Sequence, residues 1–123
     1  MAGTLTITTL SDGTNSTSAT NVVKGSAKAW CNYNGTAGTI RGSYNIASVT
    51  KNSNGNYTFN FTNAMPNANY AAVTTGGEKT VRWGIAMFGV GTPITTSSVT
   101  FTYQNPSDTS EDNAFIGMVV FSS

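Results

Sequence analysis

The stretch that decides the fold is Tyr57-Thr58-Phe59-Asn60-Phe61-Thr62. Aromatic residues alternate strictly with small polar residues, which is the pattern of a β-strand with one buried and one wet face. The preceding Asn52-Ser53-Asn54-Gly55 is typical of a hairpin turn, so we expect a second strand to pair with this one.

The same alternation recurs on both sides of this strand. No window carries a helical stripe, and Leu, a strong helix former, occurs only at positions 5 and 10. About eight or nine short strands with regularly spaced turns predict an all-β fold, an antiparallel β-sandwich or jelly-roll-like module. The expected strands cover residues 4–8, 27–33, 39–49 (one bent strand or two short ones), 57–62, 70–75, 80–88, 94–103 and 114–121.

The N-terminal segment has a different composition. Residues 11–20 are Ser, Thr, Asn, Asp and Gly with one Ala, which indicates a flexible linker without a core contribution. Leu5, Ile7 and Leu10 are too few to form a stable strand alone, but they can add to the edge of a neighbouring sheet. We therefore expect an attachment arm in residues 1–21 and a single sandwich domain in residues 22–123.

The composition excludes several kinds of site. The 123 residues include no His and one Cys, carry a net charge of +1, and are only 9% charged. Without His there is no Ser–His or Cys–His pair, and a single Cys forms no internal disulfide or CxxC zinc site. We therefore expect no enzyme and no cofactor. The low charge gives no electrostatic footprint for nucleic acid, and no apolar run predicts a signal peptide or membrane insertion.

The segment 114–121 is apolar on both faces. Phe115, Val119 and Phe121 alternate with Ile116, Met118 and Val120. It is either a central strand covered on both sides or a strand whose second face meets another subunit. The scarcity of charges that normally protect strand edges favours the second alternative. We therefore predict a homo-oligomer with Ile116, Met118 and Val120 in the interface.

Two aromatic residues and the single Cys are further candidates. Trp30 is expected on the same side of its strand as Lys28 and Asn32, either as a core tryptophan or as a contact aromatic for a glycan or a partner subunit; we include it among the interface candidates. Trp83 is expected in the core. Cys31 is expected to be a small buried hydrophobe and not a reactive thiol.

Three of the five acidic residues lie within five positions, at Asp108, Glu111 and Asp112. Their oxygens can bind Ca²⁺ or form a glycosidase carboxylate pair, although the regular spacing of a calcium loop is missing. The simpler interpretation, which we favour, is a solvated loop.

Three motifs resemble a known family. They are Lys28-Ala29-Trp30-Cys31-Asn32-Tyr33-Asn34-Gly35, Ile40-Arg41-Gly42-Ser43-Tyr44-Asn45-Ile46 and Gly55-Asn56-Tyr57-Thr58-Phe59-Asn60-Phe61-Thr62-Asn63-Ala64-Met65-Pro66-Asn67-Ala68-Asn69-Tyr70. In order and spacing they resemble small virion proteins of tailed bacteriophages, common in marine and cyanobacterial phages and often labelled tail fibre or tail-fibre-like. The family has Val at the position of Cys31 and Phe at that of Tyr33, and both replacements suit a strand. The resemblance covers roughly residues 24–70.

The resemblance implies a trimeric protein on the virion surface, assembled in the host cytoplasm, with no known catalytic residues. We expect a non-enzymatic structural protein, a β knob that contacts other virion proteins. A tail-fibre or tail-tip role, with loops 89–93 and 105–113 touching a host-surface glycan, stands slightly ahead of capsid decoration. The alternatives from other classes are a monomeric carbohydrate-binding module, with Trp30 or Tyr57 as its platform, and a small glycan-cleaving enzyme that uses the loop acids.

Overall fold

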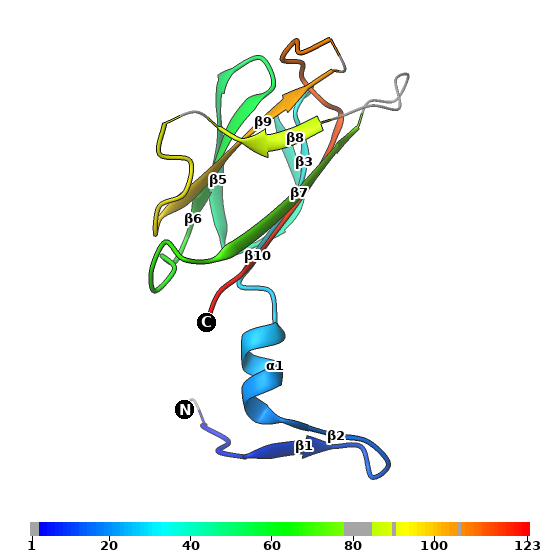
Figure 1. The fold of residues 1–123 in the computed structure, drawn as a ribbon, viewed down its shortest axis with the longest axis vertical. Coiled ribbons are helices and arrows are strands. Elements are labelled where there is room, and N and C mark those ends of the chain that lie inside the picture. The colour runs from blue at the N-terminus through cyan, green and yellow to red at the C-terminus, as the bar shows by residue number, and fades with distance from the viewer. Residues whose placement is uncertain (1–2, 78–84, 90, 106) are drawn as a thin grey trace.

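The protein is a two-layer β-sandwich with an N-terminal arm that projects from one end (Figure 1). The computed structural model describes residues 3–77, 85–89, 91–105 and 107–123. Each layer is a four-stranded sheet in which all neighbouring strands are antiparallel. The all-β sandwich expected from the alternation is therefore confirmed.

Each sheet combines strands from the first and second halves of the chain. In spatial order the first sheet contains β4 (Thr39–Tyr44), β3 (Ala29–Asn34), β10 (Phe115–Phe121) and β7 (Ala71–Gly77). The second sheet contains β5 (Ile46–Ser53), β6 (Asn56–Phe61), β9 (Ser98–Gln104) and β8 (Ile85–Phe88). The decisive stretch at 57–62 is thus the body of β6, an inner strand. Trp83 lies outside the described residues.

The chain passes from the first sheet to the second at Asn45. This residue has a φ of 56°, a conformation that Asn tolerates better than most residues. Its side chain donates to the carbonyl oxygens of Lys28 (3.0 Å) and Asn63 (3.1 Å), and accepts a hydrogen bond from the Asn63 N–H (2.8 Å). This anchored corner divides the stretch 39–49 into two strands in different sheets, the second of the two expected alternatives.

Aromatic side chains fill the space between the sheets. Tyr33 packs edge-on against Tyr57 at 5.5 Å between ring centroids and against Phe59 at 6.1 Å, a geometry that adds to the hydrophobic gain. The buried apolar residues are Ala29, Cys31, Tyr33, Tyr57, Phe59, Phe61, Met65, Tyr70, Val99, Phe101, Tyr103, Ile116, Met118 and Val120.

The core includes three residues that we expected in a subunit interface. Ile116, Met118 and Val120 are 1%, 4% and 0% exposed, because this face of β10 points between the sheets. Their assignment to an interface was wrong. The alternation of β10 was correct, but an apolar strand does not reveal from its own sequence which face points inward. The outward face carries Phe115, Val119 and Phe121.

The arm (residues 3–25) is more regular than its composition indicates. It contains a hairpin of β1 (Thr9–Ser11) and β2 (Ser16–Ser18), followed by the helix α1 (Ala19–Gly25). The expected flexible linker and the expected strand at 4–8 are therefore corrected, and the arm extends beyond residue 21. The helix was missed because two turns are too short to show a periodic pattern. It begins where the Ser18 Oγ accepts a hydrogen bond from the Asn21 N–H (3.2 Å).

Candidate attachment surfaces

The outer face of the second sheet is polar and internally hydrogen-bonded. Neighbouring strands carry opposed Thr and Asn side chains, such as Thr58 and Thr100, whose hydroxyls are 2.8 Å apart. Asn56 donates to Thr102 (2.7 Å) on the same face. Small hydroxyl and amide groups thus keep most of this nearly uncharged surface solvated, and Met87 at its β8 edge is an exposed apolar residue there.

The outer face of the first sheet is apolar. The strand register places Tyr44, Trp30, Val119 and Val73 side by side in one row across all four strands. Tyr44 is 58% exposed, Trp30 43% and Val73 56%. Soluble monomers rarely expose such contiguous patches, so the contrast between the two faces marks this one for contact with another molecule.

Trp30 is exposed, and its interpretation as a core residue was wrong. It follows the buried Ala29 and precedes the buried Cys31, so the strand alternation turns it outward. Its ring leans across the sheet towards Gly42, where a Cβ atom, if one were present, would lie 3.5 Å from the indole. The missing side chain at Gly42 therefore leaves room for the indole to lie along the sheet.

Phe115 and Phe121 extend the apolar surface to the two ends of β10, with exposures of 53% and 37%. The Arg41 guanidinium lies 4.8 Å from the centre of the Phe115 ring, a cation–π arrangement at the margin of the surface. We call the surface formed by Trp30, Tyr44, Val73, Phe115, Val119 and Phe121 the apolar face.

A hollow of about 290 Å³ interrupts the apolar face between β7 and β10. Val73, Thr75 and Val119 stand around Gly117, which contributes no side chain. The hollow has room for an aliphatic side chain supplied from outside.

The arm forms a second apolar surface. Leu5, Ile7 and Leu10 face Val22 and Val23 of α1 across a groove of about 360 Å³. None of the helix residues is buried, and Leu5 is 82% exposed. A short hairpin and a two-turn helix are marginal in water without further packing. The sequence-predicted arm residues are thus brought together, and their open side lacks a cover within the described residues.

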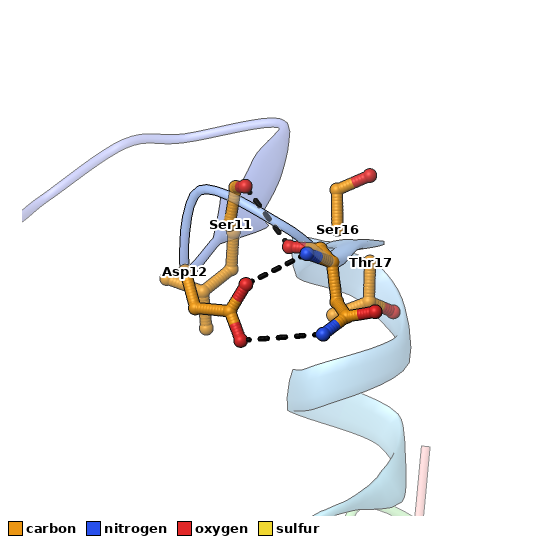
Figure 2. A pocket seen from close by; sticks show the side chains of 6 residues that line it. Ser11, Asp12, Ser16 and Thr17 are labelled. Carbon is orange, nitrogen blue, oxygen red and sulfur yellow. Dashed lines mark hydrogen bonds between the residues drawn. The ribbon is translucent and has the colours of Figure 1, made fainter.

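The tip of the arm is a turn held by Asp12 (Figure 2). Its carboxylate accepts hydrogen bonds from the N–H groups of Asn15 (2.7 Å) and Thr14 (2.9 Å). These hydrogen bonds stabilise the ionised carboxylate and hold the pKa of Asp12 below its usual value, and the bond from Asn15 has the largest effect. The carboxylate is therefore ionised at neutral pH and closes the turn.

The three acidic residues of the loop differ in their exposure and contacts. Asp108 and Glu111 are exposed, as the expected solvated loop requires. Asp112 instead accepts hydrogen bonds from the Gly55 N–H (3.0 Å) and the Tyr57 hydroxyl, and it forms an ion pair with Lys51. Partial burial raises its pKa, but these three donors outweigh that effect and hold the pKa below its usual value.

Sequence reasoning missed this anchor because Lys51 and Asp112 are distant in the chain. The described residues contain no group of three or more His, Cys, Asp and Glu side chains able to hold a metal ion. Cys31 is buried between the sheets, and this burial raises the pKa of its thiol to about 11. The expectation of a small buried hydrophobe is confirmed.

Comparison of the chain with protein-family models, curated proteins and solved structures finds no match. In the part of the chain that the structure describes, no helix has the length and apolarity to cross a bilayer. Function is therefore inferred from the two attachment surfaces and from the sequence motifs.

Proposed function

We propose that this chain is a non-enzymatic structural protein of a bacteriophage virion, a trimeric β knob on the particle surface held in place through its arm. The motifs around Trp30, Tyr44 and Phe59 supply the phage assignment. The single structural observation that carries the proposal is the pair of uncovered apolar surfaces, the apolar face and the arm groove. Such surfaces suit a protein that functions within an assembly.

Within the virion, we propose a tail-fibre or tail-tip module for host-surface contact. The loop at 107–113 lies at the end of the sandwich opposite the arm (Figure 1), which leaves it free to face a receptor when the arm is attached. Capsid decoration is the competing location, because an arm with an apolar groove can equally bridge capsid subunits.

The test is to locate the chain on assembled particles. Hosts that express a tagged copy during infection are used to produce virions, which are purified and imaged with a tag-specific gold label. We expect label on the particles, concentrated at the tail. Label on the head assigns the chain to capsid decoration instead. Particles free of label, with the tagged chain remaining in the lysate, overturn the virion role.

One observation favours a second candidate, a carbohydrate-binding module. Trp30 and Tyr44 are cross-strand neighbours on the outer face of the first sheet, and both side chains are about half exposed. Sugars stack on such aromatic platforms. Tyr57, the other platform residue considered from the sequence, is fully buried and cannot take part. Calorimetric titration of the purified chain with a panel of bacterial surface polysaccharides tests this candidate: binding that Trp30→Ala abolishes supports it, and no binding removes it.

A further inference from the structure

We infer that the arm of one copy covers the apolar face of the next copy, so that the subunits are joined head to tail by arm exchange. The inference rests on the self-association included in the proposed function. It names the partner of both attachment surfaces as a second copy of this chain.

A copy does not cover its own apolar face. The arm projects from the end of the sandwich, clear of the first sheet: α1 runs along the long axis of the molecule, and the β1–β2 hairpin lies across its far end (Figure 1). Lys28 donates a side-chain hydrogen bond to the carbonyl oxygen of Val23 near the end of α1, a contact between the helix and the start of the sandwich. Both apolar surfaces of the same chain are therefore open.

The areas of the two surfaces are similar. The four aromatic residues of the apolar face are on average about half exposed, and together they offer roughly 400 Å². Five exposed aliphatic side chains of the arm offer roughly 300–450 Å². Two apolar faces pressed together bury only the face of each chain and leave every arm uncovered. Arm exchange buries both surfaces of every chain, roughly 700–850 Å² divided between its two contacts.

The shapes of the two surfaces also match. The hollow around Gly117 is open, about 290 Å³ in volume and walled by Val73 and Val119. An arm that carries outward leucines offers a side chain that fits it, and Leu5 is the most exposed of the large apolar residues that the structure describes.

The arm and the apolar face carry opposite charges. Asp12 is the only acidic residue in the first 25 residues of the chain. Arg41 stands at the margin of the apolar face, beside Phe115. When the arm lies along β10 with its tip beside Phe115, the acidic Asp12 faces the Arg41 guanidinium, and this attraction supports the contact. Because arm and face are different patches, the contact is heterologous, and it forms a ring such as the proposed trimer when the rotation between successive copies is one third of a turn.

The first experiment measures the mass of the full chain and its variants by sedimentation at about 10 µM. Val73→Lys places a charge on the exposed centre of the contact, and Gly117→Val fills the hollow. A Cβ atom at position 117 would lie 3.0 Å from the Thr75 hydroxyl oxygen, and that exposed side chain can rotate away, so the fold is expected to persist. The matched control is Ser48→Lys, an exposed strand position on the polar face of the second sheet.

We expect the association constant to fall at least tenfold in Val73→Lys, in Gly117→Val and in a chain lacking residues 3–25, and to stay within twofold in Ser48→Lys. Circular dichroism must show the same β spectrum for all four. A full oligomer that survives removal of the arm overturns the inference and indicates face-to-face contact.

The second experiment distinguishes exchange from folding back. In a Cys31→Ala background, a chain with Leu5→Cys is mixed with a tagged chain with Val73→Cys, and the mixture is oxidised. Arm exchange predicts a crosslinked pair made of one chain of each kind. The control is a single chain with both substitutions, oxidised at high dilution: a closed intrachain disulfide there, with no mixed pair at 10 µM, shows that the arm covers its own sheet and overturns the inference.

These results are independent of the virion experiment. A chain that is found on particles but forms no mixed pair keeps the proposed location and loses arm exchange. A chain that exchanges arms but is absent from particles keeps the inference and loses the virion role.

Discussion

Replacing Asp112 with alanine is expected to cost the sandwich far more stability than its place in a polar loop suggests. The carboxylate joins the β5–β6 hairpin to the segment before β10, since it accepts from the Gly55 N–H at 3.0 Å and from the hydroxyl of the fully buried Tyr57. Asp112→Ala leaves both donors without their partner.

The magnitude follows from these contacts. A hydrogen bond to a charged acceptor contributes about 1.5–3 kcal/mol. Water can enter the space that the side chain leaves and recover part of the two bonds, so we expect a net loss of about 3 kcal/mol. The ion pair adds little, because the Lys51 side chain is 42% exposed and exposed pairs contribute about 0–1 kcal/mol.

The assay is urea denaturation followed by tryptophan fluorescence at pH 7, with Lys51→Met as the matched control. We expect the midpoint to fall by about 1–2 M in Asp112→Ala and by less than about 0.5 M in Lys51→Met. Equal losses in the two variants would refute the reasoning, because they would assign the effect to the ion pair and not to the buried donors.

The pH dependence supplies a second check. The pKa of Asp112 is lower in the folded chain than in the unfolded chain, so its contribution is present above the unfolded value of about 3.9 and is lost as the pH falls through the folded value. The stability difference between the wild type and Asp112→Ala should therefore be constant from pH 5 to 8 and shrink below pH 4.

Three further predictions concern the core. Gly55→Ala should lower the urea midpoint clearly, since φ is +67° and the added carbon would meet the Tyr103 carbonyl oxygen at 2.4 Å, while Gly25→Ala, with open space around it, should be neutral. Tyr103→Phe should cost about 1–2 kcal/mol in the same assay, because the hydroxyl of Tyr103 pairs with that of Thr74 across the two sheets. Cys31 should react with a thiol reagent at pH 8 only upon unfolding, since burial raises its pKa to about 11; rapid reaction in native buffer would contradict its burial.

Local alternation was sufficient to predict the sandwich. The alternate buried residues are aromatic in β6, and they are Val99, Phe101 and Tyr103 in β9; the structure places all of them between the sheets as expected. The corner at Asn45 was harder, because a sheet change depends on contacts with Lys28 and Asn63 that are distant in sequence.

The attachment surfaces were only partly predictable. Leu5, Ile7 and Leu10 were expected in an arm, and the structure groups them around one groove. In β10 both faces are apolar, so the direction of burial depends on neighbouring strands. Trp30 was equally ambiguous. Its size favoured the core, but Ala29, Cys31 and Tyr33 occupy the buried face of β3, so Trp30 points outward. The anchor at Asp112 depends on long-range contacts that no local pattern contains.

The central claim is that the apolar face and the arm groove are subunit contacts. The most direct measurement is the mass of the purified full chain by sedimentation equilibrium at micromolar concentration. We predict three chains per particle, or three times 12.8 kDa. A single mass of one chain across the whole concentration range would contradict this claim.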